Sequence, residues 1–152
     1  IGLMNVDGEP FVIEYNCRLG DPETESILPR IDHDIVELMM AVAEGTLDRM
    51  TLNISPLAAV TVMLVSEGYP GEYTKGKEIS GENAVAGSLV FHAGTRKDPA
   101  TGTDRTSGGR VMAITTLDAQ PSRALETTLR NAGRIVYKGK YFRRDIGSDL
   151  GF

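Results

Sequence analysis

The start of the chain carries the pattern of a β-hairpin. Residues 1–5 are apolar enough for a strand, and the Asp7-Gly8 pair that follows is a strong signal for a tight turn. A return strand is predicted over residues 11–18, where successive side chains point to opposite faces. One face of this strand carries Ile13, Tyr15 and Cys17. The other face carries the polar side chains Glu14, Asn16 and Arg18.

Two later stretches have the spacing of amphipathic helices. The first runs over residues 34–49, with Asp32 or Asp34 available as the N-cap. The second covers residues 121–136. It places six apolar side chains on one side, namely Ala124, Leu125, Leu129, Ala132, Ile135 and Val136.

The remaining apolar stretches predict strands. Residues 58–65 form a nearly continuous apolar run, typical of a buried strand, which stops at the breaker cluster 68–71. Shorter strands are predicted at 77–80, 88–93 and 109–116, with a polar loop over 97–104. The order of hairpin, helix, several strands, helix and extended tail indicates an α+β fold rather than a regular βαβ alternation.

Length and composition narrow the class of protein. The 152 residues fit one ordinary domain, or one domain with a fragment of another. With 41% apolar and 24% charged residues, the chain has an average globular composition, which excludes wholesale disorder. No run approaches the roughly 18 apolar residues of a membrane-spanning helix, so we expect no membrane partner. Cys17 is the single cysteine, which rules out intrachain disulfides and favours a cytoplasmic location.

The net charge of −5 is unevenly distributed. Residues 1–55 hold 3 basic and 11 acidic side chains, whereas residues 56–152 hold 13 basic and 10 acidic ones. This balance lacks the basic surplus of nucleic-acid-binding proteins. It suits a cleft in which carboxylates hold a metal ion on one wall and cations receive phosphate on the other, although two unrelated solvated surfaces would give the same counts. Because the sign changes near the link at residues 53–56, we expect a domain boundary there.

Glu14 and Asn16 are the strongest candidates for chemistry. In an extended strand their side chains leave the same face about 7 Å apart along the backbone. Two hard oxygen donors at this spacing can reach one Mg²⁺, or two ions bridged by nucleotide phosphates. Arg18 extends the row with a planar donor fork that suits a phosphoryl oxygen. The alternative is the exposed polar face of a half-buried hairpin.

The residues that follow form a longer motif. Residues 18–25, Arg-Leu-Gly-Asp-Pro-Glu-Thr-Glu, closely resemble the signature of the glycinamide ribonucleotide synthetase family, the phosphoribosylamine–glycine ligases. Residues 14–17, Glu-Tyr-Asn-Cys, resemble the Glu-aromatic-Asn-Cys stretch of the same family. Further matches keep the family's order at residues 68–71, 91–95, 108–111 and 144–147.

The resemblance implies that the chain corresponds to the last third of such an enzyme. Residues 1–54 resemble the C-terminal end of its ATP-grasp domain. Residues 55–152 resemble its small β-rich C-terminal domain, which has a packed helix and is related to a rudimentary single-hybrid motif. The N-terminal portion and most of the ATP-grasp portion would then be missing partners from the same protein. The chain alone is expected to be inactive.

The family's reaction implies roles for three residues of the hairpin strand. With ATP and Mg²⁺ (or Mn²⁺), these enzymes join glycine to 5-phosphoribosylamine in purine biosynthesis, giving glycinamide ribonucleotide, ADP and phosphate. By resemblance, Glu14 bridges the metal ions and Asn16 is a neutral metal ligand beside it. Arg18 is implied to stabilise charge on the phosphoryl group during its transfer.

Four further residues are implied in catalysis or substrate binding. Asp21 and Glu23 form an acidic pair suited to the ammonium of glycine or the amine of phosphoribosylamine. Asp21 is also a second catalytic candidate beside Arg18, and the alternative for Asp21 is a residue that caps the turn. Arg110, with the backbone amides of its preceding glycines, and Arg96 are candidates for binding the 5-phosphate of phosphoribosylamine. The alternative for each is an ordinary surface arginine, the usual state of this residue type. An insertion-like departure from the family's pattern over residues 96–107 weakens the case for Arg96.

Two other hypotheses remain open. One is another ATP-grasp carboxylate–amine ligase, such as a carboxylase subunit or a formate-dependent purine enzyme, although residues 18–23 argue against it. The other is a non-catalytic docking domain that retains the signature. For the remaining residues we expect structural roles, with Cys17 and the Met39-Met40 pair buried and the basic tail at residues 138–144 on a solvated face.

Overall fold

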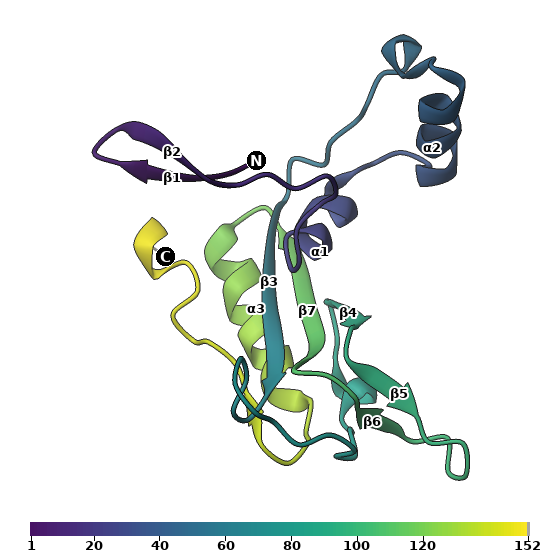
Figure 1. Ribbon diagram of the computed structural model, residues 1–152, viewed down its shortest axis with the longest axis vertical. Helices are drawn as coiled ribbons and strands as arrows, with labels where there is room; N and C mark the ends of the chain where they lie inside the picture. The colour runs from purple at the N-terminus through teal and green to yellow at the C-terminus, as the bar shows by residue number, and fades with distance from the viewer. Residues whose placement is uncertain (152) are drawn as a thin grey trace.

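The computed structural model describes residues 1–151 and has an antiparallel sheet at its centre. The sheet's four strands lie in the order β4 (Leu89–His92), β7 (Arg110–Asp118), β3 (Ala58–Ser66) and β8 (Lys140–Tyr141). Helix α3 (Pro121–Arg134) packs along β3 and β7 (Figure 1). This arrangement of a β-rich domain with one packed helix confirms the predicted α+β fold.

The two long central strands supply most of the core. In β3, every second residue from Val60 to Ser66 is buried, as expected for a strand with one fully covered face. In β7, six consecutive residues from Val111 to Thr116 are buried, so this strand is covered on both faces. The core cluster joins both strands to α3 and to the tail through Val62, Leu64, Ile79, Val111, Met112, Ile114, Ala132, Ile135, Tyr137 and Phe142.

A short helix, α1 (Thr24–Ile27), lies against the other face of the sheet. The hydroxyl of Ser26 is 2.6 Å from that of Thr61 on β3, which in turn is 2.8 Å from the hydroxyl of Thr115 on β7. Because Thr61 alternates with the buried Val62, its side chain points away from the core face. These contacts attach the N-terminal part of the chain to the C-terminal sheet.

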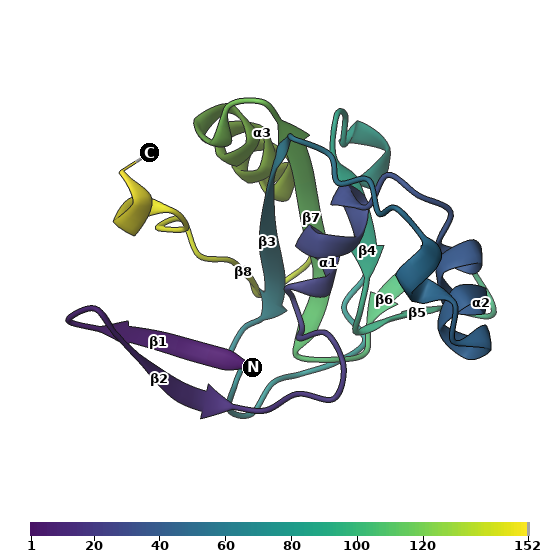
Figure 2. The same ribbon diagram turned by 90° about the horizontal axis from the view of Figure 1, so that it is seen from above.

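The predicted hairpin is present as β1 (Gly2–Val6) and β2 (Glu9–Glu14). Positive φ angles of 54° at Asp7 and 93° at Gly8 form its tight turn. Strand β2 ends at Glu14 rather than at residue 18, because Glu14 pairs with Gly2 at the start of β1 and no strand of this hairpin lies opposite the residues beyond. The hairpin stands away from the central sheet (Figures 1 and 2).

Two expectations of burial were wrong. Cys17 is an exposed free thiol. Met39 and Met40 are 57% and 53% exposed, because helix α2 (Ile35–Glu44) projects away from the sheet and buries only Leu38 and Ala41. The hairpin and α2 therefore present apolar side chains that no other element of residues 1–151 covers.

The ends of α2 follow from its flanking residues. The carboxylate of Asp34 accepts hydrogen bonds from the backbone amides of Val36 (2.7 Å) and Glu37 (3.4 Å), so Asp34 is the N-cap. The helix ends before the predicted residue 49, because Gly45 adopts a left-handed conformation with a φ of 67°. Within residues 1–151, no helix combines the length and the hydropathy needed to cross a bilayer.

The shorter strands agree with the predictions only in part. The strands predicted over 88–93 and 109–116 are β4 and β7, and the predicted polar loop is enclosed by the hairpin of β5 (Thr95–Lys97) and β6 (Asp104–Thr106). Residues 77–80 form no strand and make two isolated bridges, one from Glu78 to Arg105 and one from Ser80 to Val136. Val136 lies beyond the end of α3 and is exposed, rather than on the apolar side of the helix.

The basic tail was predicted to lie on a solvated face, but Lys140 is partly buried. Its Nζ donates hydrogen bonds to the carbonyls of Ala132 (2.7 Å), Gly133 (3.3 Å) and Ile135. These carbonyls lie at the C-terminal end of α3, where a positive charge is favourable. Burial lowers the pKa of Lys140, and the neighbouring charge of Arg144 adds to this effect.

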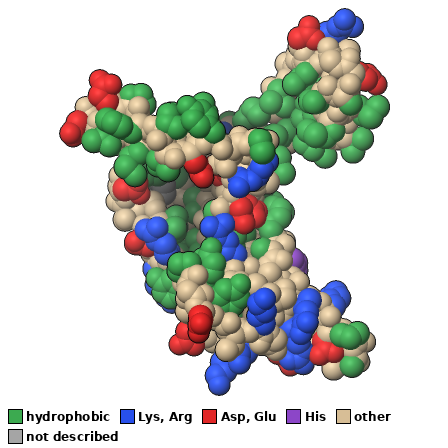
Figure 3. All heavy atoms as spheres, in the orientation of Figure 1, with side chains coloured by type: hydrophobic (Ala, Val, Ile, Leu, Met, Phe, Trp, Pro, Cys, Tyr) green, Lys and Arg blue, Asp and Glu red, His purple; other side chains and the backbone are tan. Residues whose placement is uncertain are grey.

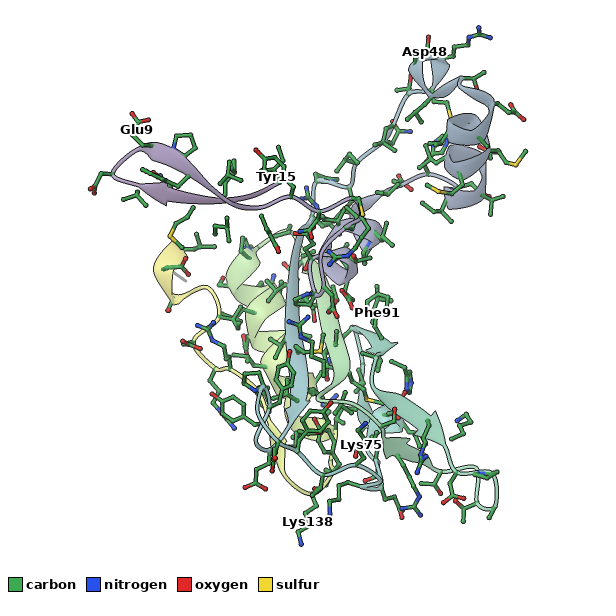
Figure 4. All side chains as sticks on the ribbon, in the orientation of Figure 1. Glu9, Tyr15, Asp48, Lys75, Phe91 and Lys138 are labelled. Atoms are coloured by element: carbon green, nitrogen blue, oxygen red, sulfur yellow. The ribbon has the colours of Figure 1, made fainter. Side chains whose placement is uncertain are left out.

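Replacing Lys140 should destabilise the domain. Lys140→Met removes a charged donor from three carbonyls, and we expect the free energy of unfolding of the chain to fall by about 1–2 kcal/mol. Urea unfolding followed by far-UV circular dichroism measures this difference. Lys138→Met is the matched control, because Lys138 is exposed (Figure 4), and should cost less than about 0.5 kcal/mol. Equal losses in the two variants would contradict the capping role of Lys140.

Candidate active site

Five of the predicted site residues line one pocket of about 410 Å³. They are Glu14, Arg18, Asp21, Glu23 and Arg110. The first four come from the end of β2 and the loop after it, and Arg110 comes from the start of β7. Figure 3 shows acidic and basic side chains next to each other where the hairpin meets the domain. The pocket therefore combines carboxylates and guanidinium groups on one surface.

Glu14 and Asn16 lie together although the strand ends between them. The amide Nδ2 of Asn16 donates a hydrogen bond of 3.0 Å to Oε1 of Glu14. The two side chains are therefore close together, as expected. Asn16, however, lies just beyond the end of β2 and not on a continuous strand with Glu14. Figure 4 labels Tyr15, the residue between them, where the hairpin approaches the body of the molecule.

The donor set of Glu14 and Asn16 fits Mg²⁺ as a partial site. Mg²⁺ is commonly held by one or two carboxylates together with substrate phosphates and water. Within residues 1–151 no three His, Cys, Asp or Glu side chains are grouped to hold a metal by themselves. The pair can therefore supply an anionic and a neutral oxygen ligand, and an ion shared by both would replace their mutual hydrogen bond.

The loop after Arg18 is ordered by Glu23. Oε1 of Glu23 accepts a 2.5 Å hydrogen bond from the backbone amide of Gly20, and the carbonyl of Gly20 accepts one from the hydroxyl of Thr24. A Cβ on residue 20 would lie 2.8 Å from Cδ of Glu23, so a larger residue there would displace this side chain from its hydrogen bond. Arg18 donates to the carbonyl of Leu19 at 3.1 Å. Glu23, rather than Asp21, is the carboxylate that caps this turn.

Asp21 is held by Arg110, which lies 89 residues later in the chain. Nη1 of Arg110 donates to the backbone carbonyl of Asp21 at 2.7 Å and lies 3.2 Å from Oδ2 of its carboxylate. Nε donates to the hydroxyl of Tyr69 at 2.9 Å. Burial lowers the pKa of Arg110, but the hydrogen bond to Tyr69 and the charge of Asp21 outweigh it, and the net pKa lies above its ordinary value.

Tyr69 contacts the pocket residue Arg110 from outside the pocket and was not predicted from the sequence. It lies in the turn that follows β3, and its ring packs against the start of β7. A Cβ on residue 109 would lie only 2.2 Å from Cδ2 of Tyr69, so Gly109 gives this ring its place. The sequence contains two signals for this contact, the Gly-Tyr-Pro-Gly cluster at residues 68–71 and the Gly-Gly-Arg sequence at 108–110. Their separation along the chain does not show that the two segments touch.

Of the two glycines before Arg110, Gly108 has its backbone amide engaged and cannot offer it to a phosphate. The backbone amides of Ser107 (2.7 Å) and Gly108 (3.1 Å) both donate to the carbonyl of Gly94. A Cβ on residue 94 would lie 2.6 Å from Cα of Gly108, so these glycines allow two backbone segments to touch. This close packing accounts for Gly94 and Gly108, and binding of a phosphate by the amide of Gly109 stays a prediction.

Arg96 is not brought to the pocket. It lies on β5, where it is exposed and faces Arg105 across the β5–β6 hairpin. Nε of Arg105 donates to the carboxylate of Asp98 at 2.7 Å. No residue of this hairpin lines the pocket that holds the other site candidates. The departure over residues 96–107 therefore forms a separate polar hairpin.

The fold and the pocket define a class of module in which a small antiparallel α+β domain holds an acidic loop that follows a projecting hairpin. A family model described as "Phosphoribosylglycinamide synthetase, C domain" matches residues 59–149. The chain belongs to this family. The resemblance inferred from the motifs is thereby confirmed.

Relatives of known name agree with this assignment. A phosphoribosylamine–glycine ligase of Chlorobaculum tepidum is 42% identical over 151 residues, which cover 97% of this chain and 35% of that protein. One from Pasteurella multocida is 43% identical over 148 residues, covering 96% of this chain and 34% of that protein. A crystal structure of phosphoribosylamine–glycine ligase from Thermotoga maritima matches with a TM-score of 0.79 and 34% identity, over 95% of this chain and 35% of that one. The chain thus spans about a third of the length of these relatives.

Proposed function

We propose that this chain is the C-terminal third of a phosphoribosylamine–glycine ligase of purine biosynthesis. The whole protein joins glycine to 5-phosphoribosylamine and converts ATP to ADP and phosphate. The observation that carries the proposal is the single pocket formed by the Gly-Asp-Pro-Glu loop, residues 20–23, and by Arg110. The identity to relatives that bear this name supports the same reaction.

The residues at the end of β2 are proposed to act on the phosphoryl group. In this reaction the γ-phosphoryl group of ATP passes to the carboxylate of glycine, and the amine of phosphoribosylamine then attacks the acyl phosphate and releases phosphate. Glu14 and Asn16 hold Mg²⁺ or Mn²⁺, which neutralises charge on the phosphates when bound. Arg18 stabilises the phosphoryl oxygens through its guanidinium group.

The other side of the pocket is proposed to bind the substrates. Asp21 and Glu23 present carboxylate oxygens to the ammonium of glycine or to the amine of phosphoribosylamine. Within residues 1–151, Nη2 of Arg110 makes no hydrogen bond, so it remains as a donor for the 5-phosphate. The proposed site leaves out Arg96, which lies outside the pocket.

The proposal also divides the chain. Residues 1–54 complete an ATP-grasp domain whose remainder lies in the missing two thirds, and residues 55–152 form the C-terminal domain. The apolar side chains of the hairpin and α2 are then covered by that remainder. On this basis the chain alone binds ATP too incompletely for catalysis, and the whole enzyme works in the cytoplasm.

Omission of each substrate tests the proposal. The full-length protein, with ATP and Mg²⁺, should release ADP only when both glycine and phosphoribosylamine are present. ADP release that needs neither glycine nor phosphoribosylamine would indicate another ATP-grasp carboxylate–amine ligase. No ADP release with any carboxylate–amine pair would favour the docking-domain hypothesis.

A further inference from the structure

We propose that Tyr69 is a positioning residue that aligns Arg110, and through Arg110 the acidic loop at residues 20–23, for binding of the amine substrate. The inference rests on the proposed function and deepens it. It assigns to the C-terminal domain a direct influence on the affinity for phosphoribosylamine. Tyr69 itself does not line the pocket.

The geometry forms a continuous chain of contacts from the sheet to the loop. The amide of Ser66 donates to the carbonyl of Gly109 at 2.8 Å, and the hydroxyl of Ser66 donates to the carbonyl of Gly108 at 3.0 Å. These bonds fix the end of β3 against the start of β7. Tyr69 follows in the turn, with its amide bonded to the carbonyl of Ser66 at 3.1 Å.

Tyr69 restrains the guanidinium group of Arg110 in two ways. Its hydroxyl accepts the Nε–H of Arg110 at 2.9 Å, and its ring lies under the guanidinium carbon, with 5.9 Å from that carbon to the ring centroid. Nη1 is thereby directed at both the backbone carbonyl and the carboxylate of Asp21. Because Nε and Nη1 belong to one rigid plane, fixing one contact orients the other.

The C-terminal end of the loop is attached to the sheet through α1, where Ser26 bonds to Thr61, but the loop's own residues do not attach its pocket side. Glu23 closes the turn on Gly20, but this bond is internal to the loop and does not place it relative to the sheet. The bonds from Arg110 to Asp21 attach the pocket side of the loop to β7. Losing the Tyr69 hydroxyl should therefore loosen the acidic loop without removing any group from the pocket.

The test compares Tyr69→Phe with Tyr73→Phe in the full-length protein. Tyr73 is a matched control, because its ring packs near Tyr69 at 6.3 Å between centroids but its hydroxyl makes no hydrogen bond within residues 1–151. For Tyr69→Phe we expect the KM for phosphoribosylamine to rise about 3- to 10-fold, with the KM for ATP unchanged. We also expect faster amide hydrogen exchange in peptides that cover residues 18–24 of the substrate-free protein. Tyr73→Phe should change neither quantity.

Each outcome decides between separate claims. Unchanged exchange over residues 18–24 in Tyr69→Phe would overturn the positioning role, whatever the activity. A parallel rise of the KM values for ATP and phosphoribosylamine would overturn it too, since that pattern indicates general destabilisation. If the wild-type protein needs neither glycine nor phosphoribosylamine for ADP release while the exchange difference persists, the proposed function fails and the positioning of the loop stands.

Discussion

Glu14→Gln should lower the kcat of the full-length protein about 10²- to 10³-fold. The substitution keeps the size of the side chain and its hydrogen bond with Asn16, but it removes the negative charge that we propose holds the metal ion beside the phosphates. Steady-state ADP release, measured at saturating glycine and phosphoribosylamine, gives the effect directly.

The matched control for this prediction is Glu9→Gln. Glu9 lies on the same strand, β2, but at the tip of the hairpin (Figure 4), and it should retain near-normal turnover. A kcat for Glu14→Gln within about threefold of the wild type would contradict the metal-binding role. Equal losses in both variants would instead indicate a general effect of charge on the hairpin.

The second large effect is expected in the core. Leu64→Ala should lower the free energy of unfolding of the chain by about 3–4 kcal/mol, because Leu64 on β3 is fully buried in the cluster that joins both central strands to α3. The loss combines the transfer of apolar surface with the cavity that remains. Urea unfolding monitored by far-UV circular dichroism is the measurement.

Leu89→Ala provides the control for the core variant. Leu89 lies on the edge strand β4 of the same sheet and is 45% exposed, so its truncation should cost less than about 1.5 kcal/mol. A loss at Leu64 no larger than that at Leu89 would contradict the assignment of Leu64 to the centre of the core.

The elements that local rules determine could be predicted from the sequence. The Asp7-Gly8 turn, an N-cap at Asp32 or Asp34 and the apolar run of β3 depend on neighbouring residues. All three are present, with Asp34 as the cap. The early end of β2 depends instead on where β1 begins, because Glu14 pairs with Gly2. Alternation within residues 11–18 contains no information about the length of the partner strand.

The exposure of apolar side chains on the hairpin and α2 could not be predicted from the sequence, for a related reason. Apolar periodicity identifies a face that is to be covered, but not which part of a protein covers it. Met39 and Met40 follow the periodicity of α2, yet nothing within residues 1–151 packs over them. The same limit applies to Cys17, whose alternation with polar neighbours implied a covered face.

The candidate site was predictable only on its local side. Glu14, Asn16 and Arg18 are close in sequence, so their proximity follows from chain geometry. The contact of Arg110 with Asp21 spans 89 residues and depends on the antiparallel pairing of β3 with β7 and on α1 against the sheet. Tyr69 was missed because its partner is chosen by tertiary packing against Gly109.

Binding of Mn²⁺ to the full-length protein with a non-hydrolysable ATP analogue is the most direct test of the metal site at the end of β2. Electron paramagnetic resonance counts the ions bound and gives their affinity in the wild type and in Glu14→Gln. We expect the variant to bind Mn²⁺ at least about 10-fold more weakly, a difference of roughly 1.4 kcal/mol. Equal affinity and an equal number of bound ions in the two proteins would contradict the proposal that Glu14 holds the metal.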